Sequence, residues 1–201
     1  MFEKVINVIW IGDASKEPTA CIESWAHGGY EVRVHDNNTL ASRPWRLHKK
    51  MKYFLENGEI NGVADCMRWE LMYEEGNFWV DADLSKTREL PDFFLELDAI
   101  AAWENEVERP GLIACGFMAF KPKDPLIKHI IDTLVNKPNL PAKAWEVVGP
   151  KALTDAFNTK NPDNLTILPS HFFYPRHLTG RTHTSTVNFA NHFWGSTFNS
   201  Y

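Results

Sequence analysis

The alternation of β-type runs with amphipathic helical segments is the feature that most restricts how this chain can fold. An apolar run at residues 5–11 ends in Gly12-Asp13, which is typical of a buried strand and a turn. Further strands are predicted over residues 30–35, 78–84, 99–103, 112–120 and 165–168. Helices are predicted over residues 19–27, 44–57, 62–75, 91–97, 125–136 and 150–157. This order predicts an α/β fold with a mostly parallel central sheet flanked by helices.

The length of the chain fits a single compact domain. Its 201 residues lie in the ordinary range for one domain, and the sequence contains no repeat and no linker-like stretch. A 44% share of hydrophobic residues and 23% of charged ones are ordinary values for a globular protein and exclude a disordered chain. We therefore expect one domain over residues 1–201, in which the last 30 residues show no clear secondary-structure pattern.

Charge and hydropathy restrict the partners and the location. The net charge of −5 disfavours nucleic acid, whose binding needs a basic surface. No apolar stretch approaches the roughly 20 residues of a transmembrane helix, and the N-terminus lacks a signal-peptide pattern. The cysteines Cys21, Cys66 and Cys115 show no CxxC spacing, which favours reduced thiols. We expect a cytoplasmic protein without a transmembrane segment, which can still act at the periphery of a membrane.

Two acidic residues, Asp81 and Asp83, carry the strongest functional signal. They lie at the end of the aromatic-rich strand predicted over residues 78–84, where alternation places both side chains on one side. Ligands bind at the carboxyl ends of strands in open α/β sheets, and two facing carboxylates suit a divalent cation. The alternative is a solvated loop that carries two acids by chance.

A second pair, Asp65 and Arg68, precedes this strand on the helix predicted over residues 62–75. The spacing of three places both side chains on one helical face, and Asp65 would lie in the first turn, where the helix dipole favours an anion. As an exposed ion pair it would contribute less than ~1 kcal/mol to folding. Removal of Arg68 would then leave the melting temperature nearly unchanged.

Together these residues form the pattern A-D-x-x-R-x-x-x-M-Y-x-x-G-N-x-W-x-D-x-D over residues 64–83. It resembles the pattern S-D-x-x-R-x-x-x-L-Y-x-x-G-G-x-Y-x-D-x-D of the DXD glycosyltransferases of the GT-A fold. That family includes the yeast Golgi initiating mannosyltransferase and bacterial capsular polysaccharide sugar transferases, with the clostridial toxin glucosyltransferase domains as distant relatives. The departures are Ala64, Met72, Asn77 and Trp79. Further resemblances cover residues 6–12, Ser24-Trp25, Gly149-Pro150 with Leu153-Thr154, and His192-Phe193-Trp194 with Thr197-Phe198.

The resemblance implies a GT-A type nucleotide-sugar-binding fold and a role for each matched residue. Asp83 would ligate Mn²⁺ or Mg²⁺, and Asp81 would reach the donor and assist the metal, so that both are catalytic. Donor binding would involve Ile9, Trp10, Asp65, Arg68 and Asp81, with the Trp10 ring stacked on the base. Trp10 could instead be a core residue of the first strand.

His192 has three interpretations: a metal ligand, a donor to phosphate, or a loop histidine without a role. The remaining histidines show no ligand spacing, and among them His171 is the next candidate.

The implied activity is transfer of a hexose from a UDP- or GDP-sugar to an acceptor hydroxyl, with retention of configuration. The acceptor would be a glycan, a lipid-linked glycan or a protein. One alternative is a non-catalytic relative that binds nucleotide sugars. Another is a metal-dependent phosphatase, because residues 81–85 fit DxDx[ST], although such enzymes carry this motif near the N-terminus and need a later acidic pair.

Overall fold

The apolar run near the N-terminus forms strand β1 (Val5–Ile9), and all five of its residues are buried. It lies inside a six-stranded sheet of order β2-β1-β3-β6-β5-β7. The other strands are β2 (Glu31–His35), β3 (Asn77–Val80), β5 (Ala99–Asn105), β6 (Arg109–Phe120) and β7 (Leu165–Leu168). Five of the six strands run in one direction, and β6 runs against them because it forms a hairpin with β5. The computed structural model describes residues 1–138, 142–185 and 187–198.

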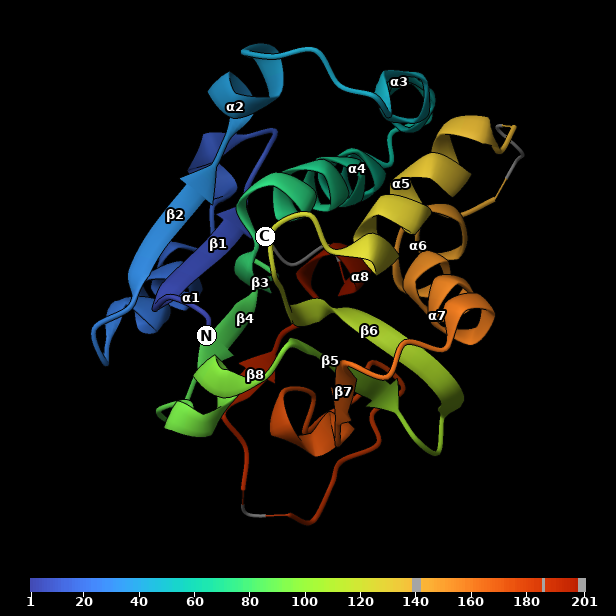
Figure 1. Cartoon of the computed structure of the whole chain (residues 1–201). Coiled ribbons are helices and arrows are strands. Elements are labelled where there is room, and N and C mark those ends of the chain that lie inside the picture. Colours follow the sequence, from blue (N-terminus) through green and yellow to red (C-terminus); the bar gives the residue numbers. More distant parts are fainter. Residues whose placement is uncertain (139–141, 186, 199–201) are drawn as a thin grey trace.

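Helices α3 to α7 cover one face of the sheet and gather at the top and right of Figure 1. The α-helices are α1 (Thr19–Glu23), α2 (Asn37–Ala41), α3 (His48–Glu56), α4 (Ile60–Glu75), α5 (Pro125–Asn136), α6 (Ala144–Val147), α7 (Pro150–Lys160) and α8 (Gly195–Phe198). Short 3₁₀ helices span Ala14–Lys16, Ser24–Ala26, Asp92–Glu96 and Ser170–Phe172. In the described parts of the chain, no helix is long and apolar enough for a bilayer.

Alternation along the strands divides the interior into two cores. Trp79 packs with α3, α4, α5 and α7 on one face of the sheet. Its neighbours Phe78 and Val80 pack on the other face, against Trp25, Phe117 and the C-terminal segment. Side chains of successive strand residues point to opposite faces, so a sheet covered on both sides needs apolar residues at nearly every position. This explains why β1 and β3 lack polar alternation and carry one polar residue each, Asn7 and Asn77.

The predicted fold class is confirmed: the chain forms one α/β domain with a mostly parallel sheet flanked by helices. Helix α5 and strand β7 have the predicted bounds. The helix predicted over 44–57 begins only at His48, and α2, which Asp36 caps through a capping box, was not predicted. The segment that showed no pattern contains β8 (Ala190–His192), which pairs with β4 (Leu84–Lys86) in a separate two-stranded sheet.

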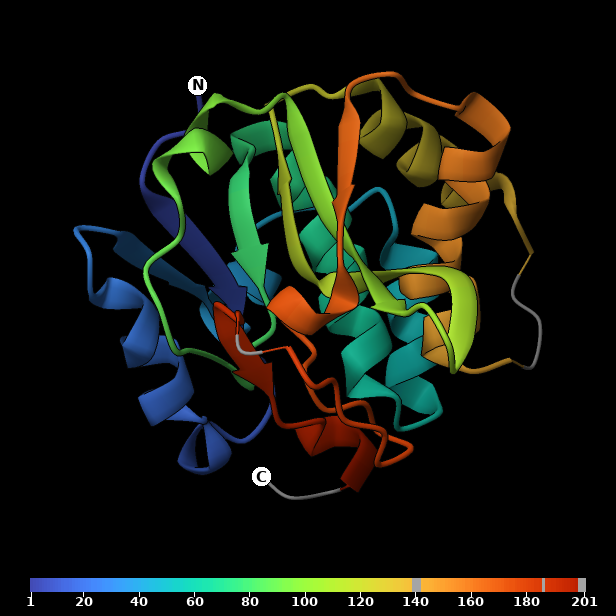
Figure 2. The ribbon, with the colours of Figure 1, turned by 90° about the horizontal axis from the view of Figure 1, so that it is seen from below.

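The predicted strand over residues 78–84 is wrong at its carboxyl end. Strand β3 stops at Val80, and residues 81–83 form a turn in which the Leu84 amide donates to the Asp81 carbonyl at 3.0 Å. The chain leaves the main sheet here because Leu84 pairs with His192 of β8. Asp81 and Asp83 therefore owe their common direction to the turn and not to strand alternation. Figure 2 shows β1 and β3 pointing toward the C-terminal segment, drawn in red.

Candidate functional site

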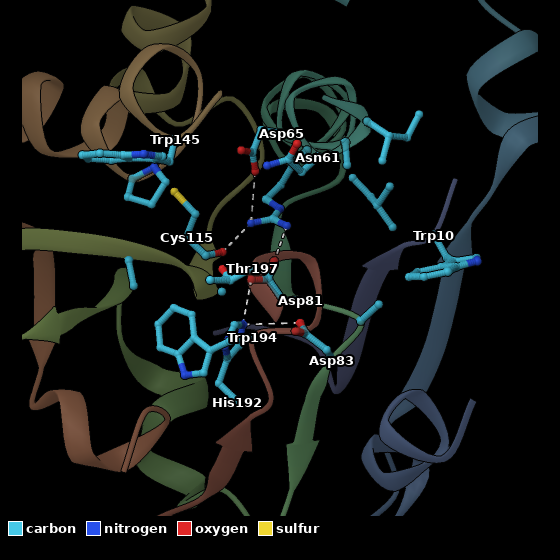
Figure 3. A pocket seen from close by; sticks show the side chains of 18 of the residues that line it. Trp10, Asn61, Asp65, Asp81, Asp83, Cys115, Trp145, His192, Trp194 and Thr197 are labelled. Atoms are coloured by element: carbon cyan, nitrogen blue, oxygen red, sulfur yellow. Dashed lines mark hydrogen bonds and ion pairs between the residues drawn. The ribbon is translucent and has the colours of Figure 1, made fainter. Parts of the chain in front are cut away.

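A cavity of about 610 Å³ lies at the carboxyl ends of β1 and β3. In Figure 3, Trp10 lies at one end and Trp145 at the other, with the acidic residues and His192 between them. All the site residues that the sequence predicted line this cavity: Ile9, Trp10, Asp65, Arg68, Asp81, Asp83 and His192. The fold thus brings together residues that are up to 183 positions apart in the sequence.

Arg68 is the structural centre of the acidic cluster. Its guanidinium is buried, donates from Nη2 to Asp81 Oδ1, and donates from Nη1 to the carbonyl of Cys115 at 2.5 Å. Asp65 Oδ1 lies 3.6 Å from Nη1. The expectation of an exposed pair is therefore wrong: the side chains of Arg68 and Asp65 are 7% and 14% exposed. Helix α4 begins at Ile60, so Asp65 also lies beyond the first turn.

The charged groups in this cluster shift one another's pKa values. Burial raises the pKa of Asp65 to about 7, against the opposing effect of Arg68. Burial alone would raise the pKa of Asp81 as well, but Arg68 and His192 outweigh it and hold that pKa well below its usual range. The pKa of Arg68 is raised, because Asp81 and Asp65 overcome the cost of burial. Arg68 thus keeps the Asp81 carboxylate charged inside the protein.

His192 lies against both acids of the turn. Its Nε2 is 3.2 Å from Asp81 Oδ2 and 3.3 Å from Asp83 Oδ1. The register of β4 with β8 puts His192 opposite Leu84, directly after Asp83. Asp83 is buried, and its Oδ2 accepts a hydrogen bond from the Gly195 amide at 2.6 Å. Burial lowers the pKa of His192, but the neighbouring Asp83 and Asp81 outweigh this and raise it.

These three residues form a donor set that suits a divalent cation. One ligand atom from each of Asp81, Asp83 and His192 lies within 4.8 Å of the others, and no second group of this kind occurs among the described residues. Ligands around an octahedral cation are about 3 to 4 Å apart, so small adjustments would suffice. The two carboxylates suit Mg²⁺ or Mn²⁺, and an imidazole favours the softer of these ions. His192 Nδ1 is buried without a hydrogen-bond partner among the described residues, whereas metal-bound histidines usually have one.

Trp10 follows β1 directly and is half-buried at the edge of the cavity. Its Nε1 donates to the Asp13 carbonyl at 3.2 Å, which fixes the plane of the ring. Part of the ring packs against the core that contains Phe78 and Val80. Trp10 therefore both packs against the core and lines the cavity, and its stacking on a base stays a prediction.

Gly116 on β6 leaves space for the side chains of the turn at residues 81–83. A Cβ atom at this position would lie 2.8 Å from Asp81 Oδ2 and 3.0 Å from the Tyr174 hydroxyl, closer than side chains tolerate. The Asp81 amide donates to the Gly116 carbonyl at 2.9 Å, so the turn is held against β6 at this point. A larger residue at position 116 would thus displace the Asp81 carboxylate or the Tyr174 side chain.

Sequence reasoning missed several residues of the cavity. Glu104, Arg109, Trp145, Tyr174 and Trp194 line it as well. Glu104 was missed because β5 extends two residues beyond the predicted strand. Trp145 and Tyr174 lay in segments without a periodic pattern, and only their aromatic character could have drawn attention to them. His171 does not line the cavity and instead contacts Phe172 and His183.

No family model matches this chain, and no curated protein sequence matches it. Solved structures do resemble its fold. The "PaToxG Glycosyltransferase" is similar with a TM-score of 0.57 and 12% identity, over 79% of this chain and 69% of that one. A "glycosyltransferase involved in the glycosylation of the major capsid of PBCV-1" is similar with a TM-score of 0.50 and 14% identity, over 96% of each chain. At such low identity the likeness establishes the fold, which these glycosyltransferases share with this chain.

Proposed function

We propose that this protein is a glycosyltransferase that moves a hexose from a nucleoside diphosphate sugar to an acceptor hydroxyl. The observation that carries the proposal is the convergence of Asp81, Asp83 and His192 at the carboxyl end of the sheet. This cluster lies in the cavity of about 610 Å³, in a fold shared with glycosyltransferases. Donor, metal dependence and retention of configuration are part of the proposal and follow the resemblance of residues 64–83 to the DXD pattern.

The donor would lie along the cavity between Trp10 and the acidic turn. The Trp10 ring would stack on the base, with Ile9 beside it, which places the diphosphate near Asp81 and Asp83. A divalent cation held by Asp81, Asp83 and His192 would supply neutralisation of the charge that develops on the leaving diphosphate. The proposal covers uridine and guanosine donors alike.

The role proposed for Arg68 differs from the donor-binding role that the sequence analysis predicted. Its guanidinium already donates to Asp81 and Cys115, so its first task is to hold the Asp81 carboxylate charged and aimed at the cavity. Asp65 lines the cavity on the same side, where its carboxyl group can bind a sugar hydroxyl. We therefore assign Arg68 as a positioning residue and Asp65 as a donor-binding residue.

The test is a thermal-shift and calorimetry series with UDP, GDP and their hexose conjugates, each with and without MnCl₂. A ligand that binds the native state alone raises its stability by RT ln(1 + [L]/Kd), so the matching nucleotide raises the melting temperature. Mg²⁺ and Mn²⁺ use substrate phosphates as ligands, so nucleotide and metal should strengthen each other. Asp83→Asn should remove this mutual effect, whereas Asp163→Asn, an exposed acid outside the cavity, should keep it.

Turnover separates an enzyme from a non-catalytic relative. Slow hydrolysis of the donor in the presence of MnCl₂, lost in Asp83→Asn, would support a transferase. Nucleotide binding without hydrolysis or transfer would favour a binding protein. If no nucleoside diphosphate changes the melting temperature with or without MnCl₂, the proposed function is wrong.

A further inference from the structure

The end of the cavity opposite Trp10 contains three residues that the proposed donor site does not use. Glu104, Arg109 and Trp145 line it, and Figure 3 shows Trp145 beyond the acidic turn as seen from Trp10. A donor that extends from Trp10 to the turn leaves this end for a second ligand. The chemistry of these three side chains indicates which ligand that is.

Trp145 and Arg109 form a stacked pair from two different elements. The Arg109 guanidinium carbon lies 4.8 Å from the centre of the Trp145 ring. Trp145 is 37% exposed and the Arg109 side chain 32%, so both remain accessible to a ligand. A guanidinium over an indole fixes the ring without hydrogen bonds, and the donors at its edge stay available.

The elements that carry the pair are held in place. The Ala144 amide at the start of α6 donates to Glu59 Oε2 at 2.6 Å, which ties the residue before Trp145 to the start of α4. The turn before Arg109 is closed by Asn105 Oδ1, which accepts from the amides of Val107 and Glu108. A rigid aromatic surface binds its ligand with less loss of entropy than a mobile one.

Glu104 completes the group as a buried acceptor. It is 3% exposed, and its Oε1 lies 2.9 Å from Arg109 Nη1 and 3.1 Å from His177 Nε2. His177 is itself fixed, since its Nδ1 is 2.9 Å from the Thr179 hydroxyl. Both of these contacts end on Oε1. Glu104 and Arg109 therefore present an acceptor and several donors, whose charges balance, beside one aromatic face.

We propose that Trp145, Arg109 and Glu104 form the acceptor subsite and that the acceptor bound there is a saccharide. A pyranose ring has an apolar C–H face that packs on an indole, and a rim of hydroxyls that need both donors and acceptors. The balanced charge of Glu104 and Arg109 does not select an anion such as a phosphate. The position beyond Asp81 and Asp83 puts the ring next to the reacting end of the donor. The assignment as acceptor rests on the proposed function, and the affinity for a saccharide does not.

The test measures two affinities on the whole protein. The saccharide probes are the methyl α- and β-glycosides of glucose, mannose, galactose and N-acetylglucosamine, followed by saturation-transfer NMR and Trp fluorescence. The nucleotide probes are UDP and GDP with MnCl₂, followed by calorimetry. Trp145→Ala should weaken saccharide binding about tenfold or more and leave the nucleotide Kd unchanged. Trp10→Ala is the matched variant and should show the reverse.

Arg109→Lys provides a second, gentler test, because it keeps a positive charge beside the buried Glu104 and removes the planar fork. It should weaken saccharide binding about threefold or more with an unchanged melting temperature. The proposal is overturned if no glycoside binds the wild-type protein, if Trp145→Ala leaves saccharide affinity unchanged, or if it weakens nucleotide binding as Trp10→Ala does. Saccharide binding at Trp145 without any nucleotide binding would instead refute the proposed function and leave a carbohydrate site.

Discussion

Replacement of Arg68 by methionine should destabilise the protein strongly, contrary to the expectation for a surface ion pair. The variant leaves three groups without their partner: the carboxylates of Asp81 and Asp65, and the Cys115 carbonyl. Removal of one member of a buried ion pair costs about 3–5 kcal/mol. Asp81 keeps His192 as a partner and its side chain is 29% exposed, so we expect the lower end, about 3 kcal/mol.

The loss of unfolding free energy in Arg68→Met should also depend on pH in a definite direction. Without Arg68, the folded-state pKa of Asp65 rises further above that of the unfolded chain, and the pKa of Asp81 rises from its lowered value. A carboxyl group whose pKa is raised in the folded protein destabilises it only at pH values at which the group must be charged. The destabilisation caused by Arg68→Met therefore grows as the pH rises. The difference in unfolding free energy between Arg68→Met and wild type should therefore be larger at about pH 8 than at about pH 5.

Urea unfolding at both pH values measures this, with Arg33→Met as the matched control. Arg33 pairs with Glu31 at 2.7 Å, but the side chains are 41% and 60% exposed, so its loss should change stability by less than ~1 kcal/mol at either pH. A loss for Arg68→Met that matches the control, or one that is the same at both pH values, would refute the electrostatic role of Arg68. A large but pH-independent loss would indicate packing alone.

Three further predictions follow from other parts of the structure. Trp10→Ala should weaken nucleotide binding by roughly 1–3 kcal/mol in calorimetry, since base–aromatic stacking has this magnitude; an unchanged Kd would leave Trp10 with a structural role. Gly116→Ala should displace the Asp81 carboxylate, 2.8 Å from the added methyl, and weaken Mn²⁺-dependent nucleotide binding; Gly29→Ala, outside the cavity, strains only its own turn at φ +80° and should not affect this binding. Burial, with Arg33, lowers the pKa of His35 to about 4, so stability should fall by up to about 3 kcal/mol as the pH drops from about 6.5 to about 4, and His35→Gln should flatten this slope in urea titrations.

The sequence by itself determined the six strands of the main sheet in their order along the chain and the residues of the acidic constellation. Local periodicity was sufficient for α5 and β7, because their apolar spacing and flanking residues are encoded within one short segment. The pattern from Asp65 to Asp83 spans one helix and one strand, and its resemblance to the DXD pattern predicted that these residues serve one site. The alternating elements similarly predicted the mostly parallel sheet.

The tertiary structure alone decided how these residues act. Asp81 and Asp83 converge because the C-terminal strand β8 draws the chain out of the main sheet and adds His192, more than 100 residues away. Arg68 is buried because α4 packs on the sheet and its guanidinium reaches the Cys115 carbonyl of β6, which no helical pattern reveals. Trp145, Arg109 and Glu104 belong to separate elements whose contact depends on packing. Contacts between distant segments depend on the whole fold, and local sequence patterns carry no signal for them.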